Sequence, residues 1–507
     1  MFRFFQPKFL LVLICAFFLI TRVYKIAEIP PSLYWDEASI GYNAYSIAET
    51  GKDEWGESFP LHFRAFGEFK LPVYIYSVVP FVKIFGLNEF SVRFPSVLFS
   101  LGIVILTYIL AKKLSNNAFV GLFSSFFITI SPWFFIFSRT GYEAMAGLMF
   151  YLLAIYFFRD YNKNIWYILL SVLGFILSAY SYNSFRIIAP LTILILVLFE
   201  IRNLKSVLKK GILPLILSVI ILIISIIPVY RLYVYDAGGS RLQVIGATKT
   251  TFIKNYISHF SPDFLLFSGD RNLRSQQGSF GQIFLPELIL LLLGFISIIN
   301  RKSRSGFLAL FLLLIGPIPA AVTRESPHAL RAISMIPFIS IISAEEISFL
   351  GKIIKQKFIF HLMIIIIFLG FFINYFLNFL DSYPVQSSKD WQYPYKKVFT
   401  DFQDNFRKYD RIIISDEYAQ PYIFALFYLK YDPDKFRQEV VRNTVDQWGF
   451  STVSKFDKFE FGKVDKLLAF GSRNALIFTT DKISYSNPLN SIKLLDKETV
   501  IWVYSLD

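Results

Sequence analysis

The chain has 507 residues, of which 55% are hydrophobic and only 17% are charged, and its mean hydropathy is +0.51. A soluble domain carries about 25% charged residues, so this composition excludes disordered and collagen-like chains. Cys15 is the only cysteine, which excludes an intrachain disulfide scaffold. What remains is a polytopic membrane protein with a formal net charge of +14.

Apolar runs of about 17–25 residues can cross roughly 30 Å of hydrocarbon. Eleven such runs are predicted, at 9–27, 92–111, 118–136, 142–158, 164–181, 185–200, 211–230, 285–300, 306–322, 331–350 and 358–380. Arg3 and Lys8 precede the first run as in a signal peptide, but no small-residue cleavage site follows it. We therefore expect the first run to be a retained helix.

The segment 71–86 is apolar but short, and it contains Pro80 and Lys83. Counting this segment as a span would move every later loop to the other side of the membrane. The charges of those loops therefore distinguish a span from a juxtamembrane helix. If 72–87 is instead a juxtamembrane helix, the loops on the N-terminal side hold these basic residues: Arg3, Lys8, Lys112, Lys113, Arg159, Lys163, Arg202, Lys205, Lys209, Lys210, Arg301, Lys302, Arg304, Lys352, Lys355 and Lys357. The short loops opposite contain only Arg139, Arg186, Arg324 and Arg331.

This asymmetry is typical of the positive-inside rule and predicts a cytoplasmic N-terminus. The sixteen basic residues, less Asp160 and Glu200 in the same loops, account for the whole net charge. The charge is thus a signature of topology, and nucleic acid is not an expected partner. We expect a multi-pass protein of the plasma (inner) membrane.

The predicted architecture is a polytopic α-helical membrane domain over 1–380 and a small α/β domain over 381–507 on the periplasmic or extracellular side. Two long outer loops, at 28–91 and 231–284, connect the spans. Within the tail, strands are predicted at 411–415, 475–479 and 500–504, with helices at 395–409 and 420–430. The spans hold few ionisable residues, whereas the outer loops are rich in acids, bases and aromatics. A transporter usually places charges at mid-membrane, so the expected site is on the outer face.

Asp36 and Glu37 follow Trp35 directly after the first span. Two interpretations stay open for Asp36. It can cap the helix that begins here, where the helix dipole also favours Glu37. Alternatively, Asp36 is a carboxylate fixed just above the bilayer that acts as a general base on a hydroxyl acceptor.

Three motifs of the first loop resemble those of the GT-C membrane glycosyltransferases. They are Trp35-Asp36-Glu37, the stretch 67–72 (Gly-Glu-Phe-Lys-Leu-Pro) and the stretch 85–96 (Phe-Gly-Leu-Asn-Glu-Phe-Ser-Val-Arg-Phe-Pro-Ser). The likeness is to the protein O-mannosyltransferase branch (glycosyltransferase family 39) and the bacterial aminoarabinose transferases. It implies a GT-C fold with juxtamembrane helices in the first loop.

The resemblance also implies a reaction: inverting transfer of one sugar from a polyprenyl-phosphate donor to a hydroxyl on a protein, lipid or glycan. Asp36 is then the expected base, and Glu37 helps to shape the active site. A phosphate already leaves well, so one carboxylate base suffices and cations are expected around the phosphate. A lipid-linked-sugar transporter or flippase and a non-catalytic envelope-assembly protein are the alternatives.

Further residues are expected to bind the donor phosphate or sugar: Glu68, Lys70, Glu143, Tyr182, Arg186, Arg271, Arg274, His328 and Arg331. Each also has an ordinary interpretation, such as a snorkelling lysine, a helix cap, an aromatic belt or a solvated loop. His328 and Arg331 are three residues apart at the start of a span, so both are predicted to point to one face.

The four histidines are scattered, and no cluster of metal ligands supports a divalent cation, although the sequence leaves one open. No cofactor is assigned. The loop 231–284 has no room for the lectin-like domain of the eukaryotic mannosyltransferases. The tail lacks the Trp-Trp-Asp motif of the oligosaccharyltransferases, so transfer of a whole glycan is not expected.

Overall fold

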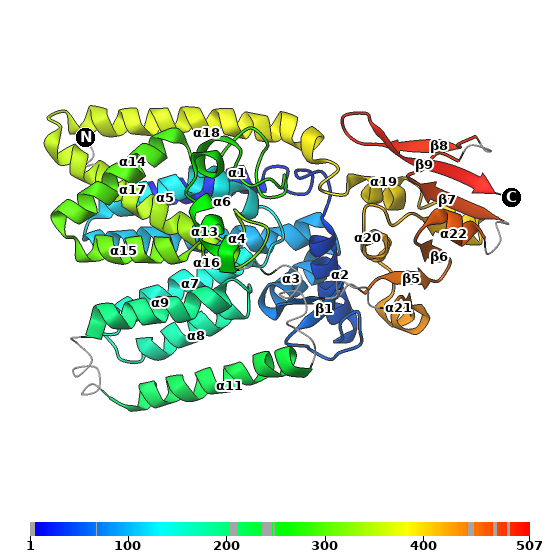
Figure 1. The fold of residues 1–507 in the computed structure, drawn as a ribbon, viewed down its shortest axis with the longest axis horizontal. Helices are drawn as coiled ribbons and strands as arrows, with labels where there is room; N and C mark the ends of the chain where they lie inside the picture. The colour runs from blue at the N-terminus through cyan, green and yellow to red at the C-terminus, as the bar shows by residue number, and fades with distance from the viewer. Residues whose placement is uncertain are drawn as a thin grey trace.

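The computed structural model describes residues 6–66, 68–201, 211–235, 246, 249–444, 451–469, 474–483 and 487–506. The molecule is elongated, with a helical bundle at one end and a sheet domain at the other (Figure 1). The bundle helices are α1 (Pro7–Val23), α4 (Glu89–Ser115), α5 (Ala118–Ile130), α6 (Pro132–Phe137), α7 (Ala144–Arg159), α8 (Tyr167–Ala179), α9 (Phe185–Glu200), α11 (Leu213–Tyr235), α14 (Leu285–Arg301), α15 (Arg304–Ile315), α16 (Ile318–Ala321), α17 (Ile336–Ile353) and α18 (Lys357–Ser387).

Every predicted apolar run coincides with a helix. Two runs are interrupted, at Ser131 before Pro132 and at Pro317, because proline lacks the N–H that would continue the ladder. By length and composition, five helical stretches in the described part of the chain can each cross a membrane: Glu89–Ser115, Leu213–Val234, Arg304–Ala321, Ile333–Ile353 and Lys357–Ser387.

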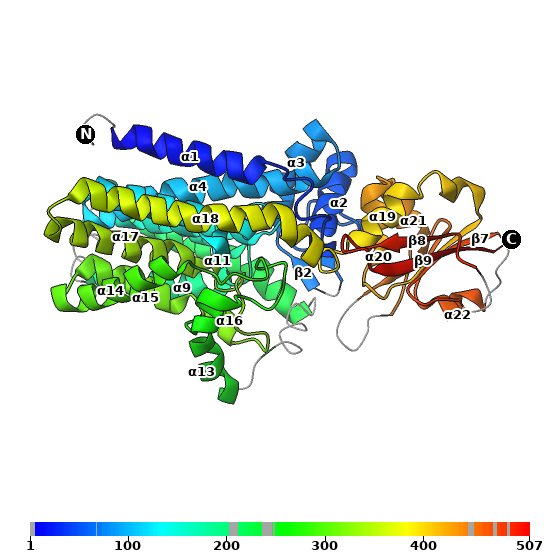
Figure 2. The same cartoon turned by 90° about the horizontal axis from the view of Figure 1, so that it is seen from above.

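The basic loops meet one another at one end of the bundle. Lys113 forms an ion pair with Asp160, and Arg159 contacts Glu200 at 2.8 Å. The N-terminus lies at the end of the bundle remote from the sheet domain, and α18 runs along the bundle to that domain (Figures 1 and 2). The predicted basic side and the C-terminal domain are therefore at opposite ends of the molecule.

The first loop folds into α2 (Trp35–Thr50), the hairpin strands β1 (Phe63–Ala65) and β2 (Glu68–Lys70), and α3 (Pro72–Phe85). The predicted juxtamembrane helix at 72–87 is thus present as α3. Its 14 residues span only about 21 Å at 1.5 Å per residue, less than the thickness of the hydrocarbon. Figure 1 shows α2 and α3 between the bundle and the sheet domain, with α2 running across the direction of the long helices.

The second outer loop contributes α13 (Lys249–Ser258) and a π-helical turn at Asp263–Phe267, and a 3₁₀ turn at Ile333–Met335 leads into α17. The helix α18 continues to Ser387, past the predicted domain boundary at 380. The chain after it forms the C-terminal sheet domain.

This domain contains one mixed seven-stranded sheet in the order β4-β5-β6-β3-β7-β9-β8. The strands are β3 (Arg411–Ile414), β4 (Val441–Arg442), β5 (Val453–Phe456), β6 (Phe459–Phe461), β7 (Ala475–Thr479), β8 (Asn490–Lys493) and β9 (Thr499–Leu506). Its helices are α19 (Tyr393–Asp401), a 3₁₀ turn at Asn405–Lys408, α20 (Pro421–Tyr428), α21 (Pro433–Glu439) and α22 (Val464–Leu468). The central β3 is parallel to β6 and β7 and fully apolar at Ile412–Ile414, as expected for a buried strand.

The helices α19 and α20 join the sheet to the first loop through one continuous apolar core. Phe427 of α20 packs directly against Gly41 of α2, where an added Cβ would lie 2.5 Å from the phenylalanine ring. Burying such a surface stabilises the contact by roughly 25 cal/mol per Å² of apolar area. The sheet domain is therefore packed onto the first loop along α2.

A buried carboxylate lies within this contact. Glu54 of the first loop is 1% exposed, and its Oε1 accepts from the Tyr422 hydroxyl at 3.3 Å. Burial raises the pKa of Glu54 to about 7, although the charge of Arg442 opposes the shift. The ordinary value is close to 4.5, so the folded protein binds this proton more readily than the unfolded chain does.

We expect Glu54→Gln to stabilise the protein at pH 8 and to have little effect at pH 5. With a raised pKa, the cost of the buried charge is absent below the unfolded pKa and grows as pH rises to about 7, on the order of 1–3 kcal/mol. Thermal unfolding in detergent at the two pH values measures the difference. The matched control is Glu49→Gln, an exposed carboxylate on α2. Equal pH dependence in wild type and Glu54→Gln would contradict the argument.

Candidate active site

Asp36 lies in the first turn of α2 and forms an ion pair with Lys70, whose Nζ is 2.6 Å from Oδ1. The lysine ends β2 immediately before α3, and its side chain is 4% exposed, whereas that of Asp36 is 22% exposed. Burial alone would lower the pKa of Lys70, but the carboxylates of Asp36 and Glu143 outweigh it and raise the pKa. The lysine is therefore a buried, charged amine shared by two carboxylates.

Two further predicted residues, Tyr182 and Arg331, converge on the pair of Asp36 and Lys70. Tyr182, in the turn between α8 and α9, has a pKa raised to about 12 by burial, to which the charges of Glu143 and Asp36 add and which Arg331 opposes. The phenol thus stays protonated at neutral pH and is a hydrogen-bond donor. The structure brings together five residues that lie far apart in the sequence: Asp36, Lys70, Glu143, Tyr182 and Arg331.

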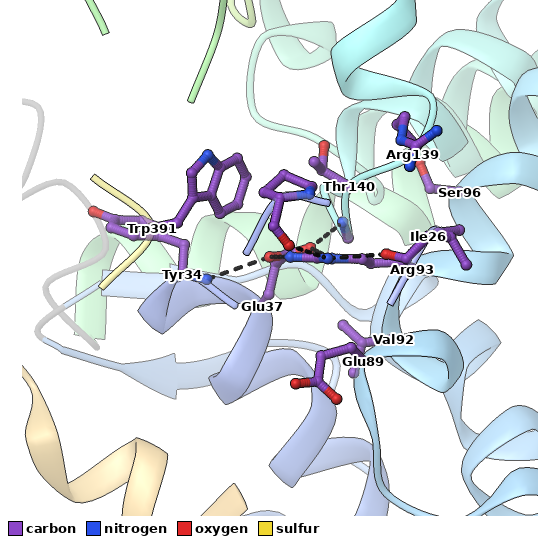
Figure 3. Close-up of polar contacts among 12 residues, drawn as sticks. Ile26, Tyr34, Glu37, Glu89, Val92, Arg93, Ser96, Arg139, Thr140 and Trp391 are labelled. Atoms are coloured by element: carbon purple, nitrogen blue, oxygen red, sulfur yellow. Dashed lines mark hydrogen bonds and ion pairs between the residues drawn. The ribbon is translucent and has the colours of Figure 1, made fainter. Parts of the chain in front are cut away.

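Glu37, the next residue, forms a fully buried pair with Arg93 of α4 (Figure 3). Arg93 Nε and Nη2 donate to the two carboxylate oxygens at 3.0 and 3.1 Å. Glu37 also accepts from the backbone amides of Gly141 at 2.6 Å and Tyr34 at 3.3 Å. Its oxygens are thus occupied by four donors, which favours a role in holding the site together over a role in proton transfer.

The remaining donors of Arg93 bind the chain that leads from α1 to α2. Nη1 donates to the carbonyls of Ile26 and Pro30, each at 3.0 Å, and Nη2 donates to Ser32 at 2.6 Å. All five N–H groups of the guanidinium therefore have an acceptor. Sequence reasoning missed this residue, although an arginine in the first turn of an apolar helix signals a buried ionic partner.

A second cluster of polar contacts is centred on Asp270 of the second outer loop, and it includes the predicted residue His328. Its carboxylate accepts from the backbone amides of Asn272 at 3.0 Å and Ala329 at 2.8 Å, and His328 Nδ1 lies 3.6 Å away. Burial raises the pKa of Asp270 while the two amides oppose the shift. Asp270 thus holds the loop at 270–274 against the start of the segment that contains His328.

Arg274 connects this cluster to α2. Its guanidinium lies 3.5 Å from the ring centre of Tyr34, the residue that precedes α2, and Nε donates to the Asn272 side chain at 3.1 Å. Burial lowers the pKa of Arg274 to about 10, with Asp390 and Tyr383 opposing the shift, so it remains a cation. Within the described ranges, its Nη1 is buried without a hydrogen-bond partner. A buried guanidinium N–H with no acceptor is suited to an anionic ligand.

Other predicted residues lie elsewhere. Arg186 contacts the Ala179 carbonyl, Tyr233 and His62, and Arg271 is exposed. The side chain of Glu68 falls outside the described residues, as does Gly67 of the same motif. Arg331, by contrast, belongs to the group around Lys70, and it also donates to Thr323 at 2.7 Å and to Glu325 at 3.3 Å.

Among the residues that the structure describes, no three His, Cys, Asp or Glu side chains are grouped as a metal ion would require.

Comparisons with known proteins show what the chain is similar to. The family model described as "Dolichyl-phosphate-mannose-protein mannosyltransferase" matches residues 70–230. The chain is similar to ArnT from Cupriavidus metallidurans in the apo state, with a TM-score of 0.60 at 11% identity over 97% of both chains. The same protein bound to undecaprenyl phosphate gives a TM-score of 0.56 at 12% identity, again over 97% of both chains.

A further similar structure is the archaeal oligosaccharyltransferase AglB from Archaeoglobus fulgidus, in complex with an inhibitory peptide and a dolichol-phosphate. Its TM-score is 0.50 at 13% identity, covering 84% of this chain and 64% of that chain. No curated protein matches the chain by sequence. The predicted resemblance to GT-C glycosyltransferases and the predicted GT-C fold are confirmed.

We expect Glu37→Gln to destabilise the protein strongly, because it leaves the buried guanidinium of Arg93 without a counter-charge, at a cost of about 3–5 kcal/mol. Thermal unfolding in detergent measures the loss. Asp401→Asn is the matched control, since it breaks a surface pair with Lys397 whose side chains are 36% and 43% exposed. That change should cost less than about 1 kcal/mol. A Glu37→Gln protein as stable as wild type would refute the role assigned to the pair.

Proposed function

We propose that the protein is an inverting glycosyltransferase that moves a single sugar from a polyprenyl-phosphate donor to a hydroxyl acceptor on the outer face of the membrane. The observation that carries the proposal is the buried Asp36–Lys70 pair, on which Glu143, Tyr182 and Arg331 converge. The fold shared with ArnT, a protein seen bound to undecaprenyl phosphate, supports a lipid-phosphate donor. The match to the mannosyltransferase family model supports sugar transfer.

The residues of the site match the needs of this reaction. The acceptor oxygen attacks the anomeric carbon while the bond to the phosphate oxygen breaks, and the acceptor proton passes to the Asp36 carboxylate. The polyprenyl phosphate leaves with one additional negative charge, so it needs cations and no general acid. One base and several cations are what the outer face provides.

Lys70 connects binding of the donor phosphate with activation of the base. Its charge neutralises Asp36 at 2.6 Å, and an arriving phosphate competes with that carboxylate for the same amine. When Lys70 turns toward the phosphate, Asp36 becomes free to accept a proton. Arg274 offers a further unpartnered N–H beside Tyr34.

Glu143 is a second candidate for the base, because it faces the same lysine as Asp36. Asp36 is the better candidate because it contacts Lys70 directly at 2.6 Å, whereas burial raises the pKa of Glu143 and so disfavours the ionised form that a base requires. The acceptor class stays open among protein, lipid and glycan.

The proposed topology places the N-terminus in the cytoplasm of a plasma (inner) membrane protein and the sheet domain outside. The positive-inside rule supports it, since the basic loops meet at the end of the bundle remote from that domain. The active site then faces the compartment that contains the sheet domain.

We expect Asp36→Asn to reduce sugar transfer by about 10²–10⁴-fold at every pH, the usual contribution of a general base. Purified protein is incubated with several polyprenyl-phosphate sugars, and candidate acceptors are analysed by mass spectrometry. Glu143→Gln is the matched comparison and should retain more activity than Asp36→Asn. A transporter, a flippase or an assembly protein would tolerate Asp36→Asn, so transfer at the wild-type rate would overturn the proposal.

We expect Arg274→Met to weaken binding of polyprenyl phosphate by roughly 10–100-fold, since a hydrogen bond to a charged group contributes about 1.5–3 kcal/mol. Methionine keeps most of the packing on Tyr34 and removes only the donors. The control is Arg324→Met, an exposed arginine on a neighbouring loop, which should bind as wild type does. Titration of the purified protein with undecaprenyl phosphate gives both affinities, and equal values for the two variants would contradict the assignment.

A further inference from the structure

The connection between the bundle and the sheet domain contains a residue with an unusual backbone. Gln392 lies between α18 and α19 and has φ 50° and ψ 34°, in the left-handed region that a glutamine rarely adopts. It is 4% exposed. A buried glutamine in such a conformation is retained only where its surroundings fix it.

The side-chain amide of Gln392 makes three hydrogen bonds. Its nitrogen donates to the carbonyls of Tyr418, at 2.5 Å, and Ala419, at 2.9 Å, and its oxygen accepts from the backbone amide of Trp35 at 2.9 Å. Two carbonyls on one side and an N–H on the other leave only one orientation of the amide. The sheet domain therefore holds a hydrogen-bond acceptor rigidly against the first residue of α2.

That acceptor meets a specific need. Trp35 is the first residue of α2, and the amides of a first helical turn have no partner within their own helix. The amide of Tyr34 is taken by Glu37, and that of Trp35 by Gln392. Asp36 follows directly, so the backbone that leads into it is fixed by one bond from within α2 and one from the sheet domain.

Other contacts of the sheet domain serve different parts of the first loop. Lys396 pairs with Glu89 at 2.8 Å, below α2 at the start of α4. Arg437 binds the far end of α2, donating to Ser46 at 3.0 Å, Thr50 at 3.2 Å and the Asp53 carbonyl at 3.0 Å. Arg437 thus makes as many bonds to the first loop as Gln392 makes in all, but at the end remote from Asp36.

We propose that Gln392 is a positioning residue for Asp36: the sheet domain fixes the first turn of α2 through the bond from Trp35 and thereby aims the carboxylate. This inference rests on the proposed function, in which Asp36 is the base. A small displacement of a reacting group costs up to about 10²-fold in rate. The C-terminal domain is then part of the catalytic apparatus without touching the substrate.

The test compares Gln392→Met with Arg437→Met in the full-length protein. Gln392→Met should lower kcat roughly 10–100-fold with the KM for the donor changed less than about twofold, because binding is kept while alignment is lost. It should also speed amide hydrogen exchange in a peptide that covers 35–38. Arg437→Met should leave both kcat and that exchange rate as in wild type.

A kcat for Gln392→Met equal to that of wild type, or an unchanged exchange rate at 35–38 in that variant, would overturn the inference. The exchange measurement needs no sugar transfer, so it decides about Gln392 even if Asp36→Asn shows that the proposed function is wrong.

Discussion

A carboxylate and a guanidinium that both leave water lose more solvation than their attraction returns, unless their other lone pairs and N–H groups also find partners. Glu37 and Arg93 meet that condition with two bonds between them, two backbone amides on Glu37 and three carbonyls on Arg93. Those backbone groups belong to three segments: the chain after α1, the start of α2 and the turn before α7, and Arg93 itself belongs to the start of α4. The outer ends of three helices are therefore positioned by one ion pair.

Glu37 and Asp36 therefore have different roles, although they are adjacent in the sequence. Because Glu37 is saturated by buried donors, it fixes the direction in which α2 begins. Asp36, one residue earlier and therefore about 100° away around the helix, faces Lys70 on another side. The amide of Trp35 is held by Gln392 from the sheet domain. An acidic pair in the sequence is thus one structural carboxylate and one available carboxylate.

Hydropathy predicted the bundle well, because an apolar run reports its surroundings directly, and the loop charges correctly separated the short α3 from the spans. The breaks at Ser131 and Pro317 shortened two runs. The strands β4, β5, β6 and β8 were missed because two to four residues are too short to show an alternating pattern. The proximity of Asp36 and Lys70 came from family resemblance. The partners of Arg93 and Gln392, 56 and 357 residues away, needed the fold.

The net charge of +14 gains a sharper meaning from burial. At the end of the bundle that holds the N-terminus, cations are exposed, as Lys163 is at 74%, and it is their total number that sets the orientation of the helices. At the end that faces the sheet domain, Arg93 and Arg139 are fully buried and act through their direction: Arg139 donates to the carbonyls of Thr21 and Tyr24 at the end of α1. Counting charge therefore indicates how the helices are inserted, whereas only the partners of each buried cation show where an anionic substrate can bind. In the described structure Arg139 Nε and Arg274 Nη1 are both buried without a hydrogen-bond partner, and of the two it is Arg274 that lies on Tyr34, at the start of α2.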